Sequence, residues 1–599
     1  MGSSSLDANT TGSYNVALGV GALGANTTAD NNTAIGYTAL LVNTTGQRNV
    51  AVGSLAMDEA TTGSDSVAVG YSAGHSITTG IENTFVGYYA GAETTTVNYN
   101  NAFGASSLQS NTTGAQNVAM GRAALYANTT ASNNTALGHH AMYANTTGTS
   151  NVAVGANALD ANTTASYNTA LGNGALGANT TGEYNTAVGY LALEDNTTGS
   201  RNTGVGRLSI GNNTTGSYNT GVGYSSLAVN TTASNNTALG YSALAVNTSG
   251  DANVAVGSLA MDANTTGASN TAVGYGALGA NTTGTENVAM GTLAGDALTT
   301  GSYNTAIGYD SLSVVTTAHD NTAVGREALR DTTSGTDNTA VGKEAGKLNT
   351  TGDKNTAVGT HALNVNTTGT YNVAVGAYSL TANTTASHNT AVGESAGELI
   401  TEGFANTMLG RAAGNATTTG DYIICIGYAT DASSATANNQ IVMGDSVTGN
   451  AANSFCFGTG STDSAIGFGA TSITAPSDVR LKEDIQDEVV GLDFINELRP
   501  VTFRWKKAKD VPPEMKVHDP DSEERVMDGK YNHGFIAQEV KEVIDNNPDI
   551  KDGFDIWSED ETDGRQRIGE GALVPMLTKA IQELSTKVEV LEKQLNNKE

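Results

Sequence analysis

One stretch of this sequence brings together residue types that could make and break a covalent bond. Residues 475–485 read APSDVRLKEDI and place Ser477 five positions before Lys482. A serine hydroxyl attacks a carbonyl only when a base takes its proton, and a lysine amine serves as that base only when burial lowers its pKa. The same spacing also fits a serine-capped helix or a simple turn. The modules on either side of Ser477 must therefore decide between these interpretations.

The composition of the chain changes at Ser477. Residues 1–476 hold 10 Lys and Arg and 29 Asp and Glu, whereas residues 477–599 hold 18 and 29. Both tryptophans, Trp505 and Trp557, and all seven prolines lie at or beyond this border. With 72 glycines and only 6% aromatic residues, the chain does not have the composition of an ordinary enzyme core. We predict two physically different modules that join at Ser477.

Charge and hydropathy exclude several classes of partner. The net charge of −30 disfavours nucleic acid and anionic membranes, because binding to phosphates needs clustered Lys and Arg. The sequence has no run of about 18 apolar residues, so we expect no membrane insertion. The N-terminal MGSSSLDANTTG has neither the charged nor the apolar region of a secretory signal. We therefore expect any extracellular role to begin by another route, such as release with a virion.

The sequence predicts no metal or cofactor. Cys425 and Cys456 are the only cysteines, and we interpret them as two small buried hydrophobic residues, with a disulfide as the alternative. The acidic runs at 519–524 and 558–564 keep no complete calcium-loop pattern, so we interpret them as solvated loops. Paired carboxylates typical of a glycosidase cleft do not recur.

An internal repeat of constant length covers most of the chain. The glycine that ends NVALG (15–19) recurs at every seventeenth position from Gly19 to Gly444, which gives 26 turns without an insertion. Asn stands four positions before this glycine in 23 of the 26 turns, and Ala stands two positions before it in 20. So constant a register indicates that every turn stacks on its neighbours.

Each turn has the pattern of a β-solenoid coil. In NTAIGYTALLVNTTGQR (32–48), apolar residues run from Ala34 and Ile35 to Ala39 and Leu40, and NTTG then breaks the pattern. Short β-forming stretches between Asn, Gly and Thr turns predict strands rather than helices. At about 4.8 Å per stacked strand, 26 coils make a rod on the order of 120 Å long. We also expect stacked Asn side chains to form amide ladders along the rod.

Two features of the repeat resemble functional motifs. Many NTT triplets satisfy the N-glycosylation pattern, but we interpret them as turn residues whose side chains satisfy the backbone. Tyrosines that follow the repeat glycine could form an aromatic stripe for sugars, and we favour a stacked structural ladder instead. These tyrosines are Tyr37, Tyr71, Tyr88, Tyr190, Tyr224, Tyr241, Tyr275, Tyr309 and Tyr428.

The small size of the repeated residues predicts an oligomer. One coil offers a Val, Ile or Leu, a Leu and two Ala for burial, and at about 25 cal/mol per Å² this gain barely offsets the entropy of ordering the chain. A threefold bundle of coils would bury one face along its whole length. We therefore predict a homotrimer.

The NTAxGxxAL core of the repeat resembles the head repeat of trimeric autotransporter adhesins. The resemblance covers roughly residues 9–447 and implies a left-handed parallel β-roll in a trimer. The repeat here is longer than the commonest one of that family, and we attribute the extra residues to the NTTG loop. The sequence shows neither the secretion signal nor the C-terminal membrane barrel of those adhesins.

After Gly444 the period fails, and we interpret residues 448–476 as a closing segment. Three motifs follow in order: SDVRLK (477–482), GLDFINELRPVTFRWK (491–506) and HGFIAQEV (533–540). Together they resemble the intramolecular chaperone, or peptidase S74, domain at the ends of phage tail fibres and tailspikes, including endosialidases. The resemblance covers residues 477–599.

This resemblance implies that the chain cleaves itself between Pro476 and Ser477. Ser477 matches the family nucleophile and Lys482 matches its partner. Lys482 is solvated and protonated in an unfolded chain, so we expect that only burial in an assembled trimer makes the pair active. For His533 we weigh assistance to this pair against ordinary packing, and favour packing. Residues that also fit the motif are Asp478, Arg480 and His533.

The last segment predicts a coiled coil. Apolar residues recur at alternating spacings of four and three, which is typical of a parallel coiled coil, and an amphipathic helix packed on its own domain is the alternative. A trimeric coiled coil would hold three chains in register before the slow pairing of the parallel rod. These apolar residues are Leu577, Ile581, Leu584, Val588, Leu591 and Leu595.

We predict a mostly β protein: a trimeric parallel β-solenoid shaft followed by a small α+β chaperone domain that ends in a coiled-coil helix. The predicted function is a phage tail fibre that attaches to a host receptor, either a glycan or a protein, and that contacts other tail or fibre proteins at its N-terminus. Its expected location is the virion, after assembly in the host cytoplasm. The alternative is a bacterial surface adhesin or filament with the same shaft and chaperone. The predicted segments are an N-terminal tail at 1–8, the shaft at 9–447, the closing segment at 448–476, the chaperone at 477–572 and the coiled coil at 573–599.

Overall fold

The computed structural model describes residues 2–460, 462–470, 473, 479, 482–515, 517–527, 529–548, 550, 556–559 and 564–598. The chain divides into two compact units, Met1–Pro476 and Ser477–Glu599. The first unit is the repeat region and the second contains the three C-terminal motifs.

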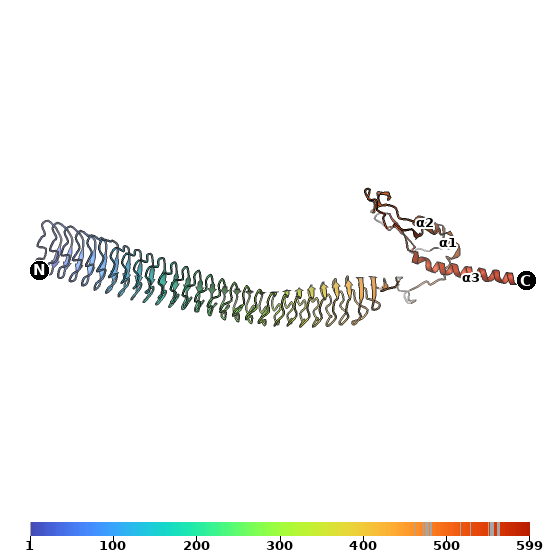
Figure 1. Cartoon of the computed structure of the whole chain (residues 1–599), viewed down its shortest axis with the longest axis horizontal. Coiled ribbons are helices and arrows are strands. Elements are labelled where there is room, and N and C mark those ends of the chain that lie inside the picture. Colours follow the sequence, from blue (N-terminus) through green and yellow to red (C-terminus); the bar gives the residue numbers. More distant parts are fainter. Residues whose placement is uncertain are drawn as a thin grey trace. The chain divides into compact units, whose positions relative to one another are not determined.

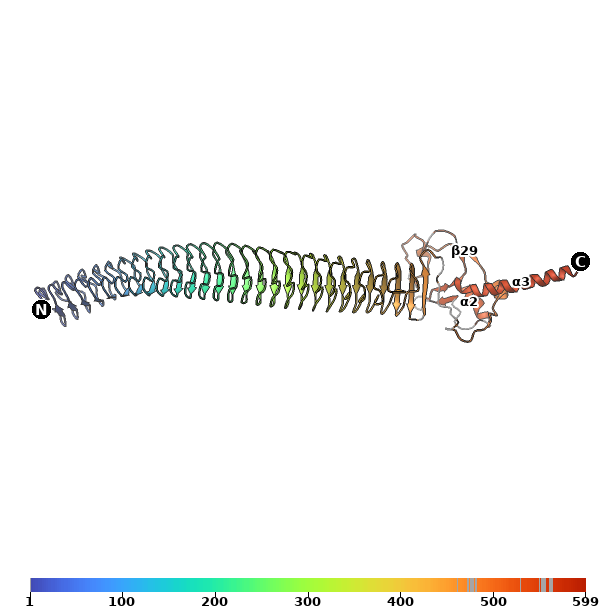
Figure 2. The same cartoon turned by 90° about the horizontal axis from the view of Figure 1, so that it is seen from below.

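The first unit is a parallel β-solenoid with one short strand per coil. Strand β1 is Val16–Leu18, and the strands β2–β25 follow at intervals of one repeat, from Thr33–Ile35 to Ile424–Ile426. Neighbouring strands pair in parallel and one repeat apart, so that Thr33 lies opposite Val50 and Ala34 opposite Ala51. The coils stack side by side from the blue N-terminal end to the orange part of the chain (Figure 1), with their strands in one row (Figure 2). The predicted solenoid of 26 coils is confirmed.

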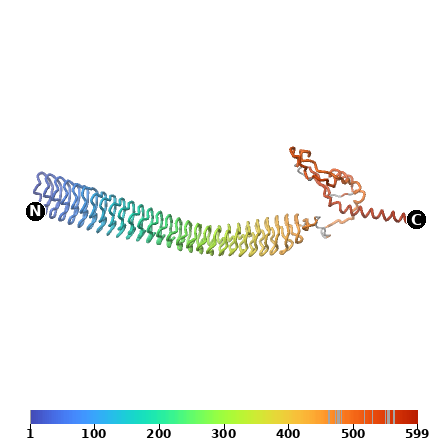
Figure 3. The backbone as a smooth tube through the Cα atoms, viewed as in Figure 1, coloured from blue at the N-terminus to red at the C-terminus, as the bar shows by residue number. Residues whose placement is uncertain are grey.

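The repeat glycine, here called the coil glycine, has a backbone that other residues rarely adopt. Gly36 has φ +144°, and a Cβ atom on it would lie 2.2 Å from the carbonyl oxygen of Gly53 in the next coil. Only glycine combines this φ with such a close approach of two backbones. Because the contact repeats from coil to coil, successive coils keep the same outline (Figure 3). Other residues are numbered below by their position before (−) or after (+) the coil glycine.

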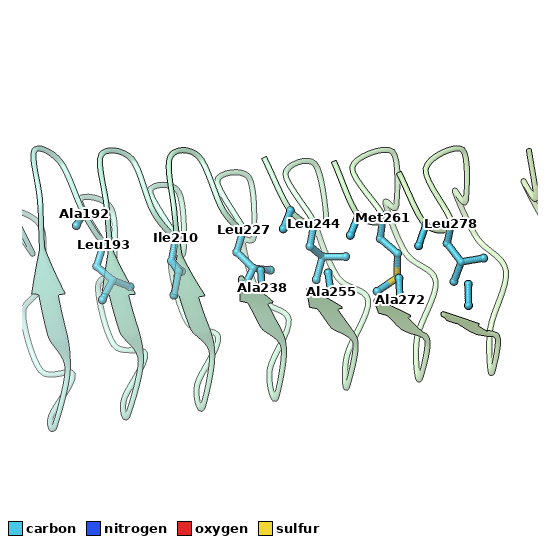
Figure 4. Packing of buried hydrophobic residues seen from close by; sticks show 14 of the residues in the cluster. Ala192, Leu193, Ile210, Leu227, Ala238, Leu244, Ala255, Met261, Ala272 and Leu278 are labelled. Atoms are coloured by element: carbon cyan, nitrogen blue, oxygen red, sulfur yellow. The ribbon is translucent and has the colours of Figure 1, made fainter. Parts of the chain in front are cut away.

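The core of each coil lies between two walls. Ala34 at −2 points inward from the strand, and Ala39 and Leu40 at +3 and +4 point inward from the turn segment; all three are fully buried. Figure 4 shows the leucines of successive coils, such as Leu244, above the strand alanines, such as Ala255. The core is one alanine and leucine seam along the shaft.

One part of the predicted core is wrong. The sequence pattern places Ile35, at −1, inside the coil, but this side chain points outward and is 36% exposed. Side chains alternate along a strand, so the inward Ala34 forces both of its strand neighbours to the outer face. The Val, Ile or Leu of each coil therefore contributes to the surface of the single chain instead of its core.

The core compensates for coils that lack the leucine at +4. Glycine occupies this position at Gly74 and Gly91, and the ring of Phe85 lies within 2.8 Å of where a Cβ would stand on either glycine. In the same way, Met408 fills the space at Gly414. At these three glycines a larger residue at −2 thus occupies the volume that the missing leucine leaves, which keeps the interior densely packed.

The predicted asparagine ladders are confirmed, and two of them run along the shaft. At +7, Asn43 donates its side-chain amide to the side-chain oxygen of Asn26, 3.2 Å away in the preceding coil, and to the carbonyl of Gly46 at 3.0 Å. At −4, the backbone amide of Asn49 donates to the side-chain oxygen of Asn32 at 3.0 Å. Buried polar groups are stable only when they are hydrogen-bonded in this way.

The ladder at +7 is interrupted where another residue replaces asparagine. One repeat after the last asparagine of each run stands another residue: Ala60 after Asn43, Leu298 after Asn281 and Ile400 after Asn383. The terminal acceptors of the three runs, Oδ1 of Asn43, Asn281 and Asn383, are buried without a hydrogen-bond partner. Each run therefore ends on a polar atom that the next coil has no donor to satisfy.

The ladders also explain the NTT triplets. The Asn of these triplets is buried where it takes part in the ladder, for example at Asn43, Asn128 and Asn264. Its amide already bonds to the preceding Asn and to a backbone carbonyl. The interpretation of the triplets as turn residues is confirmed.

The constant period ends after Gly444, and the parallel pairing ends one strand later. Strand β26 (Gln440–Asp445) pairs in parallel with β27 (Ser454–Thr459), but β27 pairs in antiparallel fashion with β28 (Thr462–Gly467). Cys425 and Cys456 are free and buried on strands two steps apart, with Val442 between them. Burial raises the pKa of the Cys425 thiol to about 12, so the interpretation of both cysteines as buried small residues is confirmed.

The second unit combines short helices with two small sheets. Its helices are α1 (Leu492–Glu497), α2 (Ala537–Asn546) and α3 (Val574–Asn596), with 3-10 turns η2 (Ala508–Asp510) and η3 (Glu570–Leu573). Strand β29 (Val501–Phe503) pairs antiparallel with β30 (Asn532–Gly534), and β31 (Trp557–Glu559) with β32 (Gln566–Ile568). The buried core includes Phe494 of α1, Val540 of α2 and Met576 of α3.

Candidate functional site

The predicted cleavage site lies mostly outside the described residues. Pro476, Ser477, Asp478 and Arg480 belong to the part of the chain that the structure does not describe. Lys482 is described and exposed, and its backbone amide donates to the carbonyl of Val479 at 3.2 Å. The roles of these residues in cleavage therefore stay predictions.

A contact between helices α1 and α3 explains the glycine at the start of the second motif, Gly491. The carboxylate of Glu583 on α3 accepts a hydrogen bond from the backbone amide of Leu492, the first residue of α1, at 2.9 Å. A Cβ atom on Gly491 would lie 2.8 Å from both oxygens of this carboxylate. Gly491 thus allows Glu583 to satisfy a free amide at the start of α1, which ties the first and last helices of the unit together.

An ion pair joins the second motif to the third. Arg499 donates from Nε to Glu539 Oε2 at 2.9 Å, and this hydrogen bond lowers the pKa of the Glu539 carboxyl. Both side chains are largely exposed, so the pair contributes little to stability on its own. Its effect is to hold the start of α2 beside the segment that follows α1.

His533 lies on the surface of the hairpin formed by β29 and β30. Its side chain is exposed, and Nδ1 lies 3.3 Å from Thr502 Oγ1 on the neighbouring strand. In the single chain its strand position directs the side chain to the surface, so both interpretations of His533, assistance to the serine and lysine pair and packing, stay predictions. The neighbouring Gly534 faces the core side, where a Cβ would lie 3.2 Å from Glu570 Oε1.

Helix α3 uses two different faces. Met576 and Ala580 are buried against the rest of the unit, and Glu583 on the same face bonds to α1. The residues of the predicted coiled-coil seam lie on another face and are all exposed. Packing on its own domain and an apolar seam for partner helices are therefore not mutually exclusive in this helix. The exposed seam residues are Leu577, Ile581, Leu584, Val588, Leu591 and Leu595.

The first acidic run is held by lysines. Glu523 forms ion pairs with Lys507 and Lys509, and their hydrogen bonds lower its pKa to about 2. Within the described residues, no group of three or more His, Cys, Asp or Glu side chains is placed to hold a metal ion. Residues 560–563 of the second acidic run lie outside the described part of the chain.

The outer surface of the strands, here called the sheet face, consists of the side chains at −3 and −1. None of its 52 positions, two in each of 26 coils, carries a charge, and the residue at −1 is apolar in every coil. All of these side chains are at least partly exposed in the single chain, as at Val205 and Val222. Sequence reasoning missed this surface, although the constant inward alanine between the two columns was a usable signal.

The tyrosines after the coil glycine form partial stacks. Tyr71 stacks on Tyr88 with ring centroids 5.6 Å apart, and Tyr224 stacks on Tyr241 at 5.4 Å. The predicted structural ladder is confirmed for these pairs. Arg207 lies between the rings of Tyr190 and Tyr224, 5.8 and 5.2 Å from their centroids, and extends the second stack.

Comparison with known proteins identifies the second unit. Residues 477–547 match the family of the chaperone of endosialidase, peptidase S74. No curated protein and no solved structure matches the chain. Among the described residues, no helix combines the length and the apolar character needed to cross a membrane. The C-terminal unit thus carries a chaperone-of-endosialidase domain, and its combination with a long β-solenoid shaft fits a protein of the tail-fibre or tailspike type.

Proposed function

We propose that the protein is a homotrimeric phage tail fibre whose shaft attaches to a host receptor. The observation that carries the proposal is the joining of a 26-coil β-solenoid to a chaperone-of-endosialidase domain. In this proposal the C-terminal unit assembles the shaft and is then released. The mature fibre is part of the virion and contacts other tail or fibre proteins at its N-terminal end. No cofactor takes part.

The sheet face supports the trimer. An outward, uncharged surface that is apolar at −1 along its whole length leaves hydrophobic area in water, and its burial stabilises an assembly. Three copies related by a threefold axis bury the same face on each chain. Because the pattern is unbroken over 26 coils, the copies gain most when they align in register.

The exposed seam of α3 supports parallel alignment of the three C-terminal ends. Six apolar residues at coiled-coil spacing lie on a face that the unit itself leaves open. Association of three such helices in a coiled coil buries the seam and brings the chains together at one end. The shaft then pairs coil by coil from a nucleus in register, which avoids the slow search for parallel pairing.

Self-cleavage follows from the proposed assembly. The Ser477 hydroxyl attacks the carbonyl carbon of Pro476, and Lys482 takes the hydroxyl proton and passes it to the departing amide nitrogen. This forms an ester between Pro476 and Ser477, which water hydrolyses to a new carboxylate and the free hydroxyl. Lys482 is exposed in the single chain, whereas a lysine amine becomes an effective base only when burial lowers its pKa. Assembly that buries the lysine therefore switches cleavage on.

Mass measurement of the purified protein tests cleavage. Wild type is expected to give two fragments divided between Pro476 and Ser477, whereas Ser477→Ala and Lys482→Ala stay intact. Ser522→Ala and Lys506→Ala, which change the same residue types elsewhere in the unit, are expected to cleave like wild type. One intact species from wild type as well as from both site variants would refute self-cleavage.

Attachment needs a separate experiment. The mature fibre is labelled with a fluorophore, and its binding to a panel of bacterial cells is measured against a labelled protein of similar charge. Saturable binding to some strains supports host attachment, whereas equal signals for both proteins on every strain contradict it. The alternative, a bacterial surface adhesin, is favoured instead if the gene lies beside a membrane-anchor gene and away from tail genes.

A further inference from the structure

The shaft has a second outer surface that differs from the sheet face. We call the side chains at +1, +2 and +5, which point outward from the wall opposite the strands, the turn face. This surface varies from coil to coil and carries charges along the shaft, as at Asp58, Arg207 and Glu394. The core alanines and leucines separate it from the sheet face. Recognition of a specific ligand needs such local variation, because a constant surface would present the same contacts to the ligand at every coil.

One region of the turn face gathers aromatic rings and positive charge on neighbouring coils. Tyr126 and Tyr143 stack with ring centroids 5.1 Å apart, and the rings of His139 and His140 stack at 3.9 Å. His140 also lies 4.8 Å from the Tyr143 ring. We call this region the turn-face patch. It consists of Arg122, Tyr126, His139, His140, Tyr143 and Asp160.

Arg122 distinguishes this patch from the rest of the shaft. Ten Lys and Arg residues lie in residues 1–476, all of them described. Nine of them contact a carboxylate or a tyrosine, as Arg48 does with Asp65 and Arg201 with Tyr218. Arg122 has neither kind of partner among the described residues, and instead its Nη1 lies 3.3 Å from Nε2 of His139. A guanidinium beside an imidazole has no charge to neutralise it.

Other polar atoms of the patch are also unengaged. The hydroxyl groups of Tyr126 and Tyr143 and the ring nitrogens of His140 make no hydrogen bond within the described residues. Burial, together with His139 and Arg122, lowers the pKa of His140, while burial raises the pKa of Asp160 at the other end of the tyrosine stack. Arg122 and His139 thus disfavour a further positive charge at His140, and an anion bound beside Arg122 would reduce this repulsion.

We propose that the turn-face patch binds an anionic saccharide, with Arg122 on its carboxylate and the aromatic rings against its sugar faces. Arginine binds carboxylates through two parallel hydrogen bonds. The exposed rings of Tyr143 and His139 present apolar surface to sugar C–H groups. The free hydroxyls and the Asp160 carboxylate bond to sugar hydroxyls. This assignment rests on the proposed attachment function and names the chemistry of the receptor.

The ligand follows from the chemistry of the patch. The shaft as a whole is acidic, with 10 Lys and Arg against 29 Asp and Glu, so a generally anionic surface polymer is repelled along most of its length. Only a saccharide that places its charge at Arg122 overcomes this repulsion. Binding is therefore expected to be local, with about one site per chain, instead of distributed along the rod.

Two variants test the site without threatening the fold. Alanine already occupies the coil position of Arg122 at Ala105 and Ala156, and that of Tyr143 at Ala228 and Ala245. Arg122→Ala and Tyr143→Ala are therefore compatible with the coil. Arg207→Ala is the matched control, because it removes an arginine from the same position in a coil where tyrosines flank it. Equal thermal unfolding of all four proteins verifies that the shaft is intact.

The full mature fibre is titrated calorimetrically with oligosialic acid, oligogalacturonate and uncharged maltohexaose. We expect at least one acidic saccharide to bind, with affinity about tenfold or more weaker in Arg122→Ala and Tyr143→Ala and unchanged in Arg207→Ala. Absence of binding by both acidic saccharides, equal affinity for maltohexaose, or unchanged affinity in both patch variants would each overturn the assignment. Cell binding that persists in both patch variants refutes the patch and leaves attachment standing, whereas absence of cell binding by wild type refutes attachment itself.

Discussion

The side-chain amide of Asn364 donates a hydrogen bond to the backbone carbonyl of Glu344, 2.9 Å away in the preceding coil. Asn364 stands at +5, and Asp296 stands at the same position four coils earlier. An ionised carboxylate has no proton to donate to such a carbonyl. Oδ1 of Asp296 is accordingly buried without a hydrogen-bond partner.

Replacing Asp296 with asparagine should therefore stabilise the shaft. We expect Asp296→Asn to raise the midpoint of thermal unfolding at pH 7, with a gain of about 1 kcal/mol for the new hydrogen bond. Circular dichroism of the two proteins measures the difference. Asp337→Asn, which removes an exposed carboxylate, is the control and should have little effect. An equal midpoint for Asp296→Asn and wild type would contradict the expected bond.

The gain should depend on pH in a defined direction. Burial, assisted by Asp310, raises the pKa of Asp296 above its ordinary value. The folded shaft therefore binds a proton at the Asp296 carboxyl more tightly than the unfolded chain does. The stability that this protonation contributes is complete below the unfolded pKa and is lost as pH rises through the folded pKa. The advantage of Asp296→Asn should thus be largest at neutral pH and shrink in acid.

Glu327 predicts the opposite pH dependence. Its carboxylate contacts Lys347 of the next coil at 2.6 Å and Arg330 at 3.0 Å, and hydrogen bonds from Lys347 and then Arg326 lower its pKa to about 2. A depressed carboxyl pKa contributes stability above the unfolded value, near 4.5, which is lost as pH falls toward 2. Glu327→Gln should lower the unfolding midpoint at pH 7, and the difference from wild type should close below pH 4.5.

The control for Glu327 is another carboxylate of the shaft. Glu394 pairs with Arg411 across 3.2 Å, but both side chains are well exposed. Glu394→Gln should therefore change the midpoint very little at any pH. If both variants lose the same stability at pH 7, burial does not distinguish the two ion pairs.

The coil glycine gives a prediction about the backbone. Gly240 has φ +143°, and an added Cβ would lie 2.4 Å from the carbonyl oxygen of Gly257. Gly240→Ala should separate two stacked coils and reduce the yield of folded shaft severely. Gly250→Ala is the control for the backbone conformation, because an added Cβ there would approach the carbonyl oxygen of Gly267 at least as closely, but Gly250 lacks the positive φ and alanine occupies the same coil position one repeat earlier at Ala233. Equal protease resistance of the two variants would show that the positive φ of Gly240 is not what excludes alanine.

The sequence predicted the architecture because its period and its turn residues act locally. One coil glycine per repeat, an inward alanine and an Asn–Thr turn determine the coil, and their repetition determines the stack. The outward position of Ile35 could not be read in the same way. The sequence alone does not distinguish an apolar residue on the outer face of a strand from one in the core. Only the burial of Ala34 together with Ala39 and Leu40 between the two walls shows which strand face is inside.

The candidate sites were less predictable for different reasons. Motifs indicated Ser477 and Lys482, but the chemistry of a serine and lysine pair depends on burial, which spacing does not encode. Arg122 was missed because its distinction is the lack of a partner. Comparing each basic residue with the residues one repeat away would have found it, since Arg122 faces Ala105 and His139 where Arg48 faces Asp65.

The proposed trimer predicts that charge on the sheet face blocks assembly. In Val222→Asp, three carboxylates would be brought together at the interface, which costs far more than a single exposed charge. We expect this variant to stay monomeric or aggregate in analytical ultracentrifugation, whereas wild type sediments as a trimer. Ser225→Asp is the control, because Asp310 already occupies that turn-face position. A trimer of Val222→Asp would exclude the sheet face as the interface.

Helix α3 allows assembly to be separated from folding. Leu591 is 63% exposed on the seam, whereas Met576 is 6% exposed and packs into the core of its own unit. Leu591→Ser should leave the C-terminal unit folded but weaken the association of the chains, since the seam loses a buried leucine only in the assembly. Met576→Ser should unfold the unit, because it places a polar group in the core and leaves a cavity. Ultracentrifugation gives the oligomeric state, and the near-ultraviolet circular dichroism of Trp505 and Trp557, the only tryptophans of the chain, reports folding of the unit. If Leu591→Ser assembles and cleaves like wild type, the association of the chains does not start at the seam of α3.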